Sequence, residues 1–334
     1  MRSAAPTLEA VAREADVSRA TVSRVVNGSL KVSPEVVTAV NAAIAKLNYV
    51  PNRAARSLAS RTAGAIALIV PEDVTRFFGD PYFAAIVQGI TRRLDESDYL
   101  LNLLVASTDP GHKTMRYLRS GIVDGALVVS HHEGDELQHD AGKTVPLVFG
   151  GRPSSEFDEH PFVDVDNVEG GRLGTAHLVE IGRRRIGTIT GSLDMPAGID
   201  RLTGFRLAME AAELPAGAEE SADFTVAGAI AATRRLLDRV PDLDGLFVAS
   251  DLMATGALAV LRERGRAVPG DVAVVGFDDS PAATSAAIPL TTVHQPSEQM
   301  GFEMADLLLR HLAGDTDVPR RNIMPTRLVR RASA

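Results

Sequence analysis

Short apolar runs alternate with amphipathic segments of helical length from residue 64 almost to the end of the chain. Seven runs have the length and apolar content of buried strands: "GAIALIVP" at 64–71, "YLLNLLVA" at 99–106, "DGALVVS" at 124–130, "VPLVFG" at 145–150, "RIGTITG" at 185–191, "LDGLFVAS" at 243–250 and "VAVVGFDD" at 272–279. The segments expected to form helices are 82–98, 110–120, 167–182, 200–213, 227–240 and 251–265. Continuous apolar strands that alternate with helices are typical of parallel sheets covered on both faces. The pattern predicts an α/β body and leaves open whether the strands form one large sheet or two smaller ones.

The composition excludes several other classes of protein. The chain has 334 residues, 45% hydrophobic and 23% charged, which is typical of a globular protein of two or three domains. It contains no Cys, which excludes disulfide scaffolds, thiol nucleophiles and Cys-ligated metal sites. No apolar run approaches the ~20 residues of a membrane span, and the N-terminal segment lacks the apolar stretch of a signal peptide. We therefore expect a soluble cytoplasmic protein that does not contact a membrane.

The charge is distributed unevenly along the chain. Residues 1–61 contain nine Lys or Arg and four Asp or Glu, a net charge of +5, whereas the remaining residues carry a net charge of −13. A basic head on an acidic body is typical of a chain with one module that binds a polyanion. A basic but merely solvated surface would give the same counts, so the charge alone does not decide between them.

The basic head is predicted to form three short helices. Thr7 is a candidate N-cap for a first helix, and Ser18 for a second helix that runs to Asn27. A third helix is expected to begin at Ser33-Pro34 and to reach about Leu47, since proline is favoured at the first helical position. Only three residues separate the first two helices, so the chain must change direction abruptly between them.

The second of these helices has two chemically different faces. Val22, Val25 and Val26 recur at helical spacing and form the expected buried stripe. The opposite face carries side chains that can bond base edges and phosphates, with an alanine that can contact a thymine methyl: Arg19, Ala20, Ser23, Arg24 and Asn27. These features favour a helix-turn-helix, and the alternative is a small three-helix bundle with a charged outer surface.

The head also resembles a known family. "TLEAVAREADVSRATVSRVVNG", followed by "VSPEVVTAVNAAIAKLNYVPNRAARSLAS", is similar to the DNA-binding head of the lactose-repressor/galactose-repressor family of bacterial transcription regulators, without a gap from Thr7 to Ser60. The resemblance implies an all-α helix-turn-helix domain at 1–50 and a hinge helix and linker at 51–63. The candidate DNA-binding residues are Thr7, Ser18, Arg19, Ala20, Thr21, Ser23, Arg24, Asn27, Asn52, Arg53 and Leu58.

The hinge segment has a separate role in this family. Asn52 is a candidate cap for "RAARSLAS", a helix too short to be stable in isolation. In family members such a helix forms when two subunits meet on the operator, and a leucine from it enters the minor groove as a wedge. The matching residue is Leu58, for which the alternative is a linker residue that packs on the body.

The body resembles the two-lobed periplasmic-binding-protein-like core of the same family. Segments such as "DVDNVEGGRLGTAHLVEIGRRRIGTITG" and "VPGDVAVVGFDDSPAATSAAIPLTTVHQP" match its landmarks in order. The resemblance implies a core at 64–334 with two parallel-sheet lobes, in which the chain crosses near Asp166-Asn167, near His294-Gln295 and near Asn322. Lobe one is expected at about 64–165 and 296–320, and lobe two at about 166–293 and 322–331.

Ligands of such sheets bind at the carboxyl ends of the strands, where the lobes meet. The candidate effector-binding residues are Tyr82, Phe83, Arg152, Arg201, Ser250 and Asp278. For Phe83 the alternative is a core residue, and for Arg201 a surface salt bridge. Asp279 is interpreted as a structural cap. Two positions depart from the family pattern, since Ser250 replaces a common Asn and Gly150-Gly151 replaces an acid of sugar-binding members.

Enzyme and metal sites find little support. The chain has no P-loop and no G-x-S-x-G motif, and "EGGRLG" precedes rather than follows an apolar strand, so it does not match the dinucleotide fingerprint. His131, His132 and His139 lie in a polar loop with spacing unsuited to one helical face. We expect no enzymatic activity, no cofactor and no metal.

The sequence therefore favours a ligand-responsive, sequence-specific repressor that acts as a homodimer on a pseudo-palindromic DNA operator. A sugar is the favoured effector, because the candidate cleft residues are polar. The alternative is a solute-binding or sugar-metabolising protein with the same core, and the basic head argues against it. The residues leave both induction and corepression open.

Overall fold

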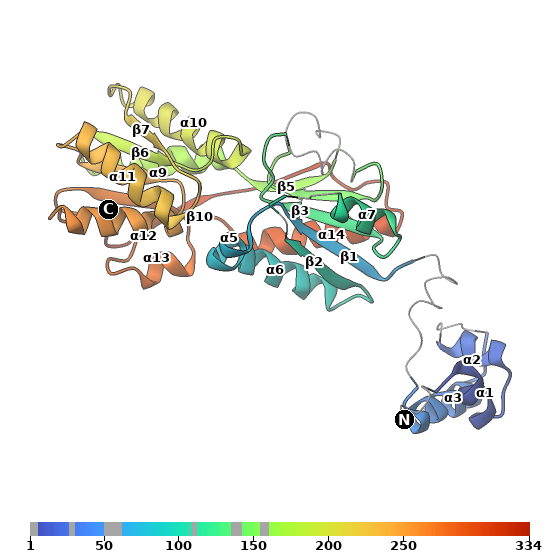
Figure 1. The fold of residues 1–334 in the computed structure, drawn as a ribbon. Helices are drawn as coiled ribbons and strands as arrows, with labels where there is room; N and C mark the ends of the chain where they lie inside the picture. Colours follow the sequence, from blue (N-terminus) through green and yellow to red (C-terminus); the bar gives the residue numbers. More distant parts are fainter. Residues whose placement is uncertain are drawn as a thin grey trace. The chain divides into compact units, whose positions relative to one another are not determined.

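The structure is a computed structural model that describes residues 6–26, 31–49, 62–105, 107–108, 112–134, 142–153 and 160–334. It contains two compact units, Met1–Ala63 and Gly64–Ala334 (Figure 1). The predicted hinge helix, with Asn52, Arg53 and Leu58, lies outside the described residues, as does Asn27. None of the helices in the described ranges has the length and hydrophobicity needed to cross a bilayer.

The first unit contains the three predicted helices. Their bounds are α1 Leu8–Glu14, α2 Arg19–Val26 and α3 Pro34–Leu47. The Thr7 side chain accepts a hydrogen bond from the Ala10 amide, and the Ser18 hydroxyl accepts one from the Thr21 amide at 3.1 Å. Both predicted caps are therefore present, and they satisfy amides that a helix N-terminus otherwise leaves unbonded.

A small apolar core holds these helices together. Val11, Val22 and Val40, one from each helix, are fully buried at its centre. Val25 and Val26 were predicted to share the buried face of α2, but they are only partly buried. The eight-residue helix contacts a core of just two other short helices, so its buried stripe is narrower than the valine spacing predicted.

Lobe one of the second unit is a six-stranded sheet in the order β11-β5-β4-β3-β1-β2, and all its pairs are parallel. Side chains alternate along β1: Ile66 and Leu68 belong to the core that includes α6 and α14, and Ala67 and Ile69 to the core under α7. The elements are β1 Ala65–Val70, α5 Val74–Gly79, α6 Pro81–Leu94, β2 Leu100–Val105, α7 Lys113–Arg119, β3 Gly125–Val129, β4 Leu147–Gly150, β5 Phe162–Val165, α14 Ser297–Leu312 and β11 Arg321–Met324.

Lobe two is a second six-stranded sheet in the order β12-β10-β9-β8-β6-β7, parallel except for the β10–β12 pair. Its elements are α9 Asn167–Glu180, β6 Ile186–Thr190, α10 Pro196–Ala211, β7 Ala218–Ser221, α11 Val226–Arg239, β8 Gly245–Val248, α12 Asp251–Glu263, β9 Ala273–Asp278, α13 Pro281–Ser285, β10 Thr291–His294 and β12 Arg327–Val329. The strands thus form two sheets, as the family resemblance implies.

The third crossing between the lobes differs from its predicted position. Strand β11 pairs with β5 in lobe one, and β12 pairs with β10 in lobe two, so the chain crosses between Met324 and Arg327 rather than near Asn322. Residues 322–324, which were assigned to lobe two, therefore belong to lobe one. These two strands have only four and three residues, so their sheet membership depends on pairing that local sequence does not encode.

All seven predicted strands are present, and five further strands were not predicted from their apolar content. The additional strands are β5, β7, β10, β11 and β12. Strand β7, for example, has the sequence "AEES" and is mostly half-exposed. Strands β7, β11 and β12 lie at sheet edges, where one side of the ladder faces solvent and a continuous apolar run is unnecessary. Strands β5 and β10 are paired on both sides, but each has only four residues.

Two helices of lobe two contact each other through backbone at glycines. A Cβ on Gly171 in α9 or on Gly204 in α10 would lie 2.3 Å or less from a backbone carbonyl oxygen of the opposite helix. Helices α6 and α14 of lobe one meet at glycines in the same way. The contact fixes the distance between α9, which begins at Asn167, and α10, which carries Arg201.

We expect Gly204→Ala to reduce the free energy of unfolding by about 1–3 kcal/mol, because its methyl group overlaps the Val168 carbonyl and forces the helices apart. Urea denaturation of the full chain measures the change. Gly79→Ala is the matched control, since no atom lies within 4 Å of a Cβ at that helical glycine. Equal stability of the two variants would contradict the proposed close contact.

Candidate functional site

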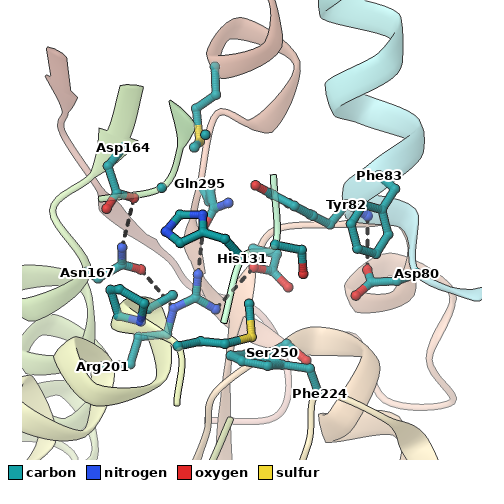
Figure 2. A pocket seen from close by; sticks show the side chains of 18 of the residues that line it. Asp80, Tyr82, Phe83, His131, Asp164, Asn167, Arg201, Phe224, Ser250 and Gln295 are labelled. Carbon is teal, nitrogen blue, oxygen red and sulfur yellow. Dashed lines mark hydrogen bonds and ion pairs between the residues drawn. The ribbon is translucent and has the colours of Figure 1, made fainter. Parts of the chain in front are cut away.

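A cavity of about 670 Å³ lies between the two lobes of the second unit. Its walls come from the carboxyl ends of strands in both sheets and from the helices and loops that follow them, the position where open α/β sheets bind ligands. Figure 2 shows Arg201 hydrogen-bonded within the pocket, with Tyr82 and Phe83 of helix α6 in another part of its wall. The lining residues are Arg76, Asp80, Tyr82, Phe83, Ser130, His131, Gly150, Gly151, Arg152, Asp164, Asn167, Met195, Pro196, Ala197, Arg201, Phe224, Ser250, Asp278, Gln295 and Met300.

The structure brings all six candidate effector residues to this one cavity. Tyr82, Phe83 and Arg152 line it from lobe one, and Arg201, Ser250 and Asp278 from lobe two. They are separated by up to 196 positions in sequence, so their common location is a property of the tertiary structure.

Arg201 lies in the second turn of α10 and not at a strand end, as its position after the "TGSLD" segment had suggested. It is only 5% exposed, which excludes the alternative of a surface salt bridge. Its guanidinium donates to the Asn167 side chain at 2.9 Å, to the Ala249 carbonyl at 2.6 Å and to the Gln295 side chain at 2.7 Å. A fourth, longer contact of 3.5 Å reaches Asp278. Since a guanidinium has five N–H groups, one remains for a ligand.

Asp278 ends strand β9 beside Arg201, and its side chain is 11% exposed. Burial raises the pKa of its carboxyl, and the Arg201 charge opposes that shift. Its φ of 110° is unusual for a residue with a Cβ, and such strained backbone is concentrated at functional sites. Asp279 was interpreted as a helix cap, but Ser280 caps α13, and Asp279 instead contacts His294 and Arg331.

The aromatic residues form an apolar wall. Phe83 is 1% exposed and contacts the rings of Phe77 and Tyr82, so it is a core residue whose ring also lines the cavity. Phe224 of lobe two adds a further ring, above which lies the Arg76 guanidinium. Such faces can pack against the apolar faces of a ring-shaped ligand.

Ser250 and Arg152 have structural partners of their own. Ser250 is the N-cap of α12, and its hydroxyl oxygen accepts from the Met253 amide, so the hydroxyl proton is available to a ligand. Arg152 extends from lobe one to Asp200 in lobe two, with N–O distances of 2.8 and 2.9 Å. Gly150 and Gly151 line the cavity beside it without side chains.

The first unit has an exposed polar face on α2. Arg19, Ala20 and Arg24 are exposed, and Thr21 and Ser23 are half-exposed. Arg19 is 3.2 Å from Glu9, an ion pair between two exposed side chains that is weak in water. Thr7 and Ser18 are also exposed at the helix starts. The predicted DNA-contacting residues that the structure describes thus share a solvent-accessible surface.

Comparison with known proteins identifies the chain. Residues 7–52 match the family described as "Bacterial regulatory proteins, lacI family", and residues 175–334 match "Periplasmic binding protein-like domain". The chain is 47% identical over 335 aligned positions to the HTH-type transcriptional regulator CelR of Thermobifida fusca, covering 98% of each protein. The chain belongs to the LacI family.

Solved structures of the LacI family agree with this assignment. A CelR–cellobiose complex has 45% sequence identity and a TM-score of 0.79, and covers 98% of this chain and all of that one. A lac repressor dimer bound to operator and the anti-inducer ONPF has 29% identity and a TM-score of 0.85, with 98% of each chain covered. The predicted family and fold class are confirmed. The chain is a ligand-responsive, DNA-binding transcription regulator and not a free solute-binding protein.

Several cavity residues of this LacI-family regulator were not predicted from the sequence. Asp164 is buried and accepts hydrogen bonds from the amides of Arg152 and Val165 and from the Asn167 side chain. Burial raises its pKa to about 6. Asp80 caps α6, and burial raises its pKa too. For Asp80 the signal available was its position at a helix start, which is equally typical of ordinary caps, and for Asp164 it was an acid inside an otherwise apolar strand.

The other unpredicted residues join the cavity to the crossings between the lobes. Asn167 follows the first crossing and Gln295 lies in the second, and both hold the Arg201 guanidinium (Figure 2). No signal in the sequence near either residue indicates this contact, because the partners are 34 and 94 positions apart.

The charges of the cavity are largely balanced by protein groups. Arg201 has Asp278, Arg152 has Asp200, and Arg76 contacts Glu72 at 2.7 Å. Asp80 and Asp164 add acceptors without an additional paired arginine. The cavity therefore offers hydrogen-bond donors and acceptors beside apolar rings, and it favours an uncharged polar ligand over an anion.

The described histidines of the polar loop contact protein groups. The His132 ring contacts Glu72 and Asp194, and His131 contacts the Arg152 carbonyl oxygen, while His139 lies outside the described residues. Among the residues that the structure describes, no group of three or more His, Asp or Glu side chains is arranged to hold a metal ion.

Proposed function

We propose that this protein is a repressor whose effector is an uncharged gluco-disaccharide of the cellobiose kind, bound in the cavity between the lobes. The observation that carries the proposal is the cavity lined by Arg201, Asp278, Asp164 and aromatic side chains, in a chain 45% identical to a regulator solved with cellobiose. The effector binds and dissociates unchanged, so the proposal assigns no enzymatic activity.

The chemistry of the cavity supports a neutral sugar. Sugar hydroxyls can both donate and accept, which suits Asp278 and Asp164 as acceptors and the remaining Arg201 N–H as a donor. The half-exposed Tyr82 ring and Phe224 offer apolar surface to the C–H faces of pyranose rings.

The proposed DNA partner is a pseudo-palindromic operator bound by a homodimer. The exposed face of α2 supports base reading by Arg19 and Ala20 and phosphate contacts by Ser18, Thr21, Ser23 and Arg24. The lac repressor, solved as a dimer on operator, is the precedent for this geometry. We assign minor-groove insertion to Leu58 on the family resemblance, and cytoplasmic location follows from a chromosomal target.

The effector acts by shifting the population of lobe arrangements. A ligand that contacts both lobes binds the closed arrangement more tightly than the open one, and this difference in affinity sets how far it shifts the equilibrium. The shift changes the position of the two DNA-binding heads in the dimer. Arg201 contributes directly, because its partners Asn167 and Gln295 lie at two crossings between the lobes.

The test combines operator selection with ligand titration. DNA that binds the full-length protein is selected from a random pool, and its affinity is measured by fluorescence anisotropy with and without cellobiose. We expect cellobiose to change the affinity at least tenfold, about 1.4 kcal/mol, whereas ribose and glucose 6-phosphate have no effect at the same concentration. An unchanged operator affinity, or an equal response to the phosphorylated sugar, would contradict the assignment.

A further inference from the structure

The two lobes touch through a histidine next to the effector cavity. The His132 Nδ1 atom lies 2.8 Å from a carboxylate oxygen of Asp194, which belongs to the loop between β6 and α10 of lobe two. The Glu133 amide donates to the Asp194 carbonyl at 2.8 Å in the same place. The neighbouring residues His131 and Met195 line the cavity itself. This contact is made only when the lobes are together.

The second ring nitrogen of His132 also faces a carboxylate. Its Nε2 atom lies 3.1 Å from a Glu72 oxygen, in the loop between β1 and α5 of lobe one. A neutral imidazole has one N–H group and one acceptor nitrogen, so it can donate to only one of two carboxylates. The other pair would then place two lone pairs against each other. The observed contacts therefore require the imidazolium form, in which both nitrogens donate.

The charges around His132 favour the same form. Glu72, Asp194 and Arg76 lie around it or its partners, and the Glu72 oxygen also accepts from the Ser130 hydroxyl. These two carboxylates and one guanidinium carry a net charge of −1, which favours a protonated His132. Glu72 is only 7% exposed, so an unbalanced charge there is costly.

We propose that His132 is a proton-dependent latch, such that closure of the lobes over the effector takes up a proton at His132. The proposal rests on the proposed function, since the effector is what holds the lobes closed. When the lobes separate, Asp194 leaves His132, whereas Glu72 stays beside it in lobe one. The ring then holds its proton less tightly, and the lost proton must be recovered on closure.

The sign of the effect follows from linkage. The hydrogen bond to Glu72, reinforced by that to Asp194 and opposed by desolvation, raises the pKa of His132 to about 9 in the closed contact. Opening removes the Asp194 contribution and thereby lowers this pKa, while the Glu72 contribution remains. The stabilisation of the closed form by protonated His132 is therefore fully present below the pKa of the open form. It is lost as the pH rises through about 9. Effector affinity falls with rising pH in this window, by up to about tenfold per pH unit.

Calorimetry with cellobiose tests the latch on the full-length protein. Binding heats at pH 8 in buffers of different ionisation enthalpy give the number of protons taken up, and we expect about 0.5–1 for the wild type. In His132→Gln, which keeps a polar side chain without a titratable proton, uptake falls to near zero and the affinity becomes nearly independent of pH from 7.5 to 9. Asp194→Asn, which removes the partner that departs on opening, also reduces the uptake.

A matched control separates protonation from closure in general. Asp200→Asn removes a second ion pair between the lobes, Arg152–Asp200, which does not involve His132. It is expected to weaken binding but to leave the proton uptake unchanged. Equal uptake in the wild type and His132→Gln, or heats that do not depend on the buffer, would overturn the latch.

If cellobiose gives no binding heat at any pH, the proposed effector is rejected. The latch can still be tested by a separate measurement. The pKa of His132 is then measured by NMR titration of the unliganded protein and of Asp194→Asn. A pKa at least one unit lower in the variant supports the latch, and equal values reject it.

Discussion

Replacement of Arg201 by alanine is expected to abolish effector binding and to destabilise the second unit by about 3–5 kcal/mol, the cost of breaking a buried ion pair from one side. The substitution leaves the Asn167 and Gln295 side chains and the Ala249 carbonyl without their donor, and Asp278 without its counter-charge. It also removes the cation over the Phe277 ring, 3.6 Å from its centroid. Thermal denaturation and calorimetry with cellobiose measure the two effects.

Arg206→Ala is the matched control for this substitution. Arg206 lies on the same helix, its side chain is 60% exposed, and it pairs with Glu219 at the surface. Its removal should change stability by less than about 1 kcal/mol and leave effector affinity unchanged. If Arg201→Ala behaved like Arg206→Ala in both measurements, Arg201 would be neither a structural centre nor an effector contact.

Asp278→Asn is expected to weaken effector binding by about 10- to 100-fold, or about 1.4–2.8 kcal/mol. The amide keeps the shape of the side chain but replaces a charged acceptor by a weaker neutral one, and it leaves the buried Arg201 charge uncompensated. Calorimetry with cellobiose at pH 7.5 gives the affinity. Binding to the selected operator without effector should remain at the wild-type level, because the substitution lies in the second unit and adds no atoms.

The control for Asp278→Asn is Asp279→Asn, which removes the charge at the adjacent position outside the cavity lining. Asp279 contacts Arg331 and His294, so its variant is expected to lose some stability while retaining effector affinity. Wild-type affinity in Asp278→Asn would reject the carboxylate as an effector contact, and equal losses in both variants would indicate a general disturbance of the β9 end.

Arg201 also connects the cavity to the movement between the lobes. Asn167 begins α9 directly after the first crossing, and Gln295 lies within the second, and the guanidinium donates to both. A ligand that bonds the remaining Arg201 N–H therefore acts on a group that is already held by the hinge. His132 and Asp194 form a second connection between the lobes, through a different pair of loops.

The prediction from the sequence succeeded where the signal is local. The three head helices begin where the sequence predicts, at the caps Thr7 and Ser18 and at the proline of α3. Their starts are predictable because capping depends on a few neighbouring residues. The apolar runs predicted seven strands. Six of them, all except the edge strand β2, lie inside a sheet and are buried on both faces, where a strand must be apolar throughout. The family resemblance added the positions of Arg201 and Asp278, which the structure places in one cavity.

The sequence by itself thus determined the helical head with its exposed polar face, the α/β body and the principal cavity residues. Only the tertiary structure decided which strands share a sheet, that the third crossing lies between Met324 and Arg327, and that Asp164 and Asn167 belong to the cavity. It also decided that His132 faces Asp194, 62 positions away. The physical reason is that helix and strand periodicity is encoded within a few residues. The partner of a buried charge, by contrast, is set by contacts between segments far apart in the chain.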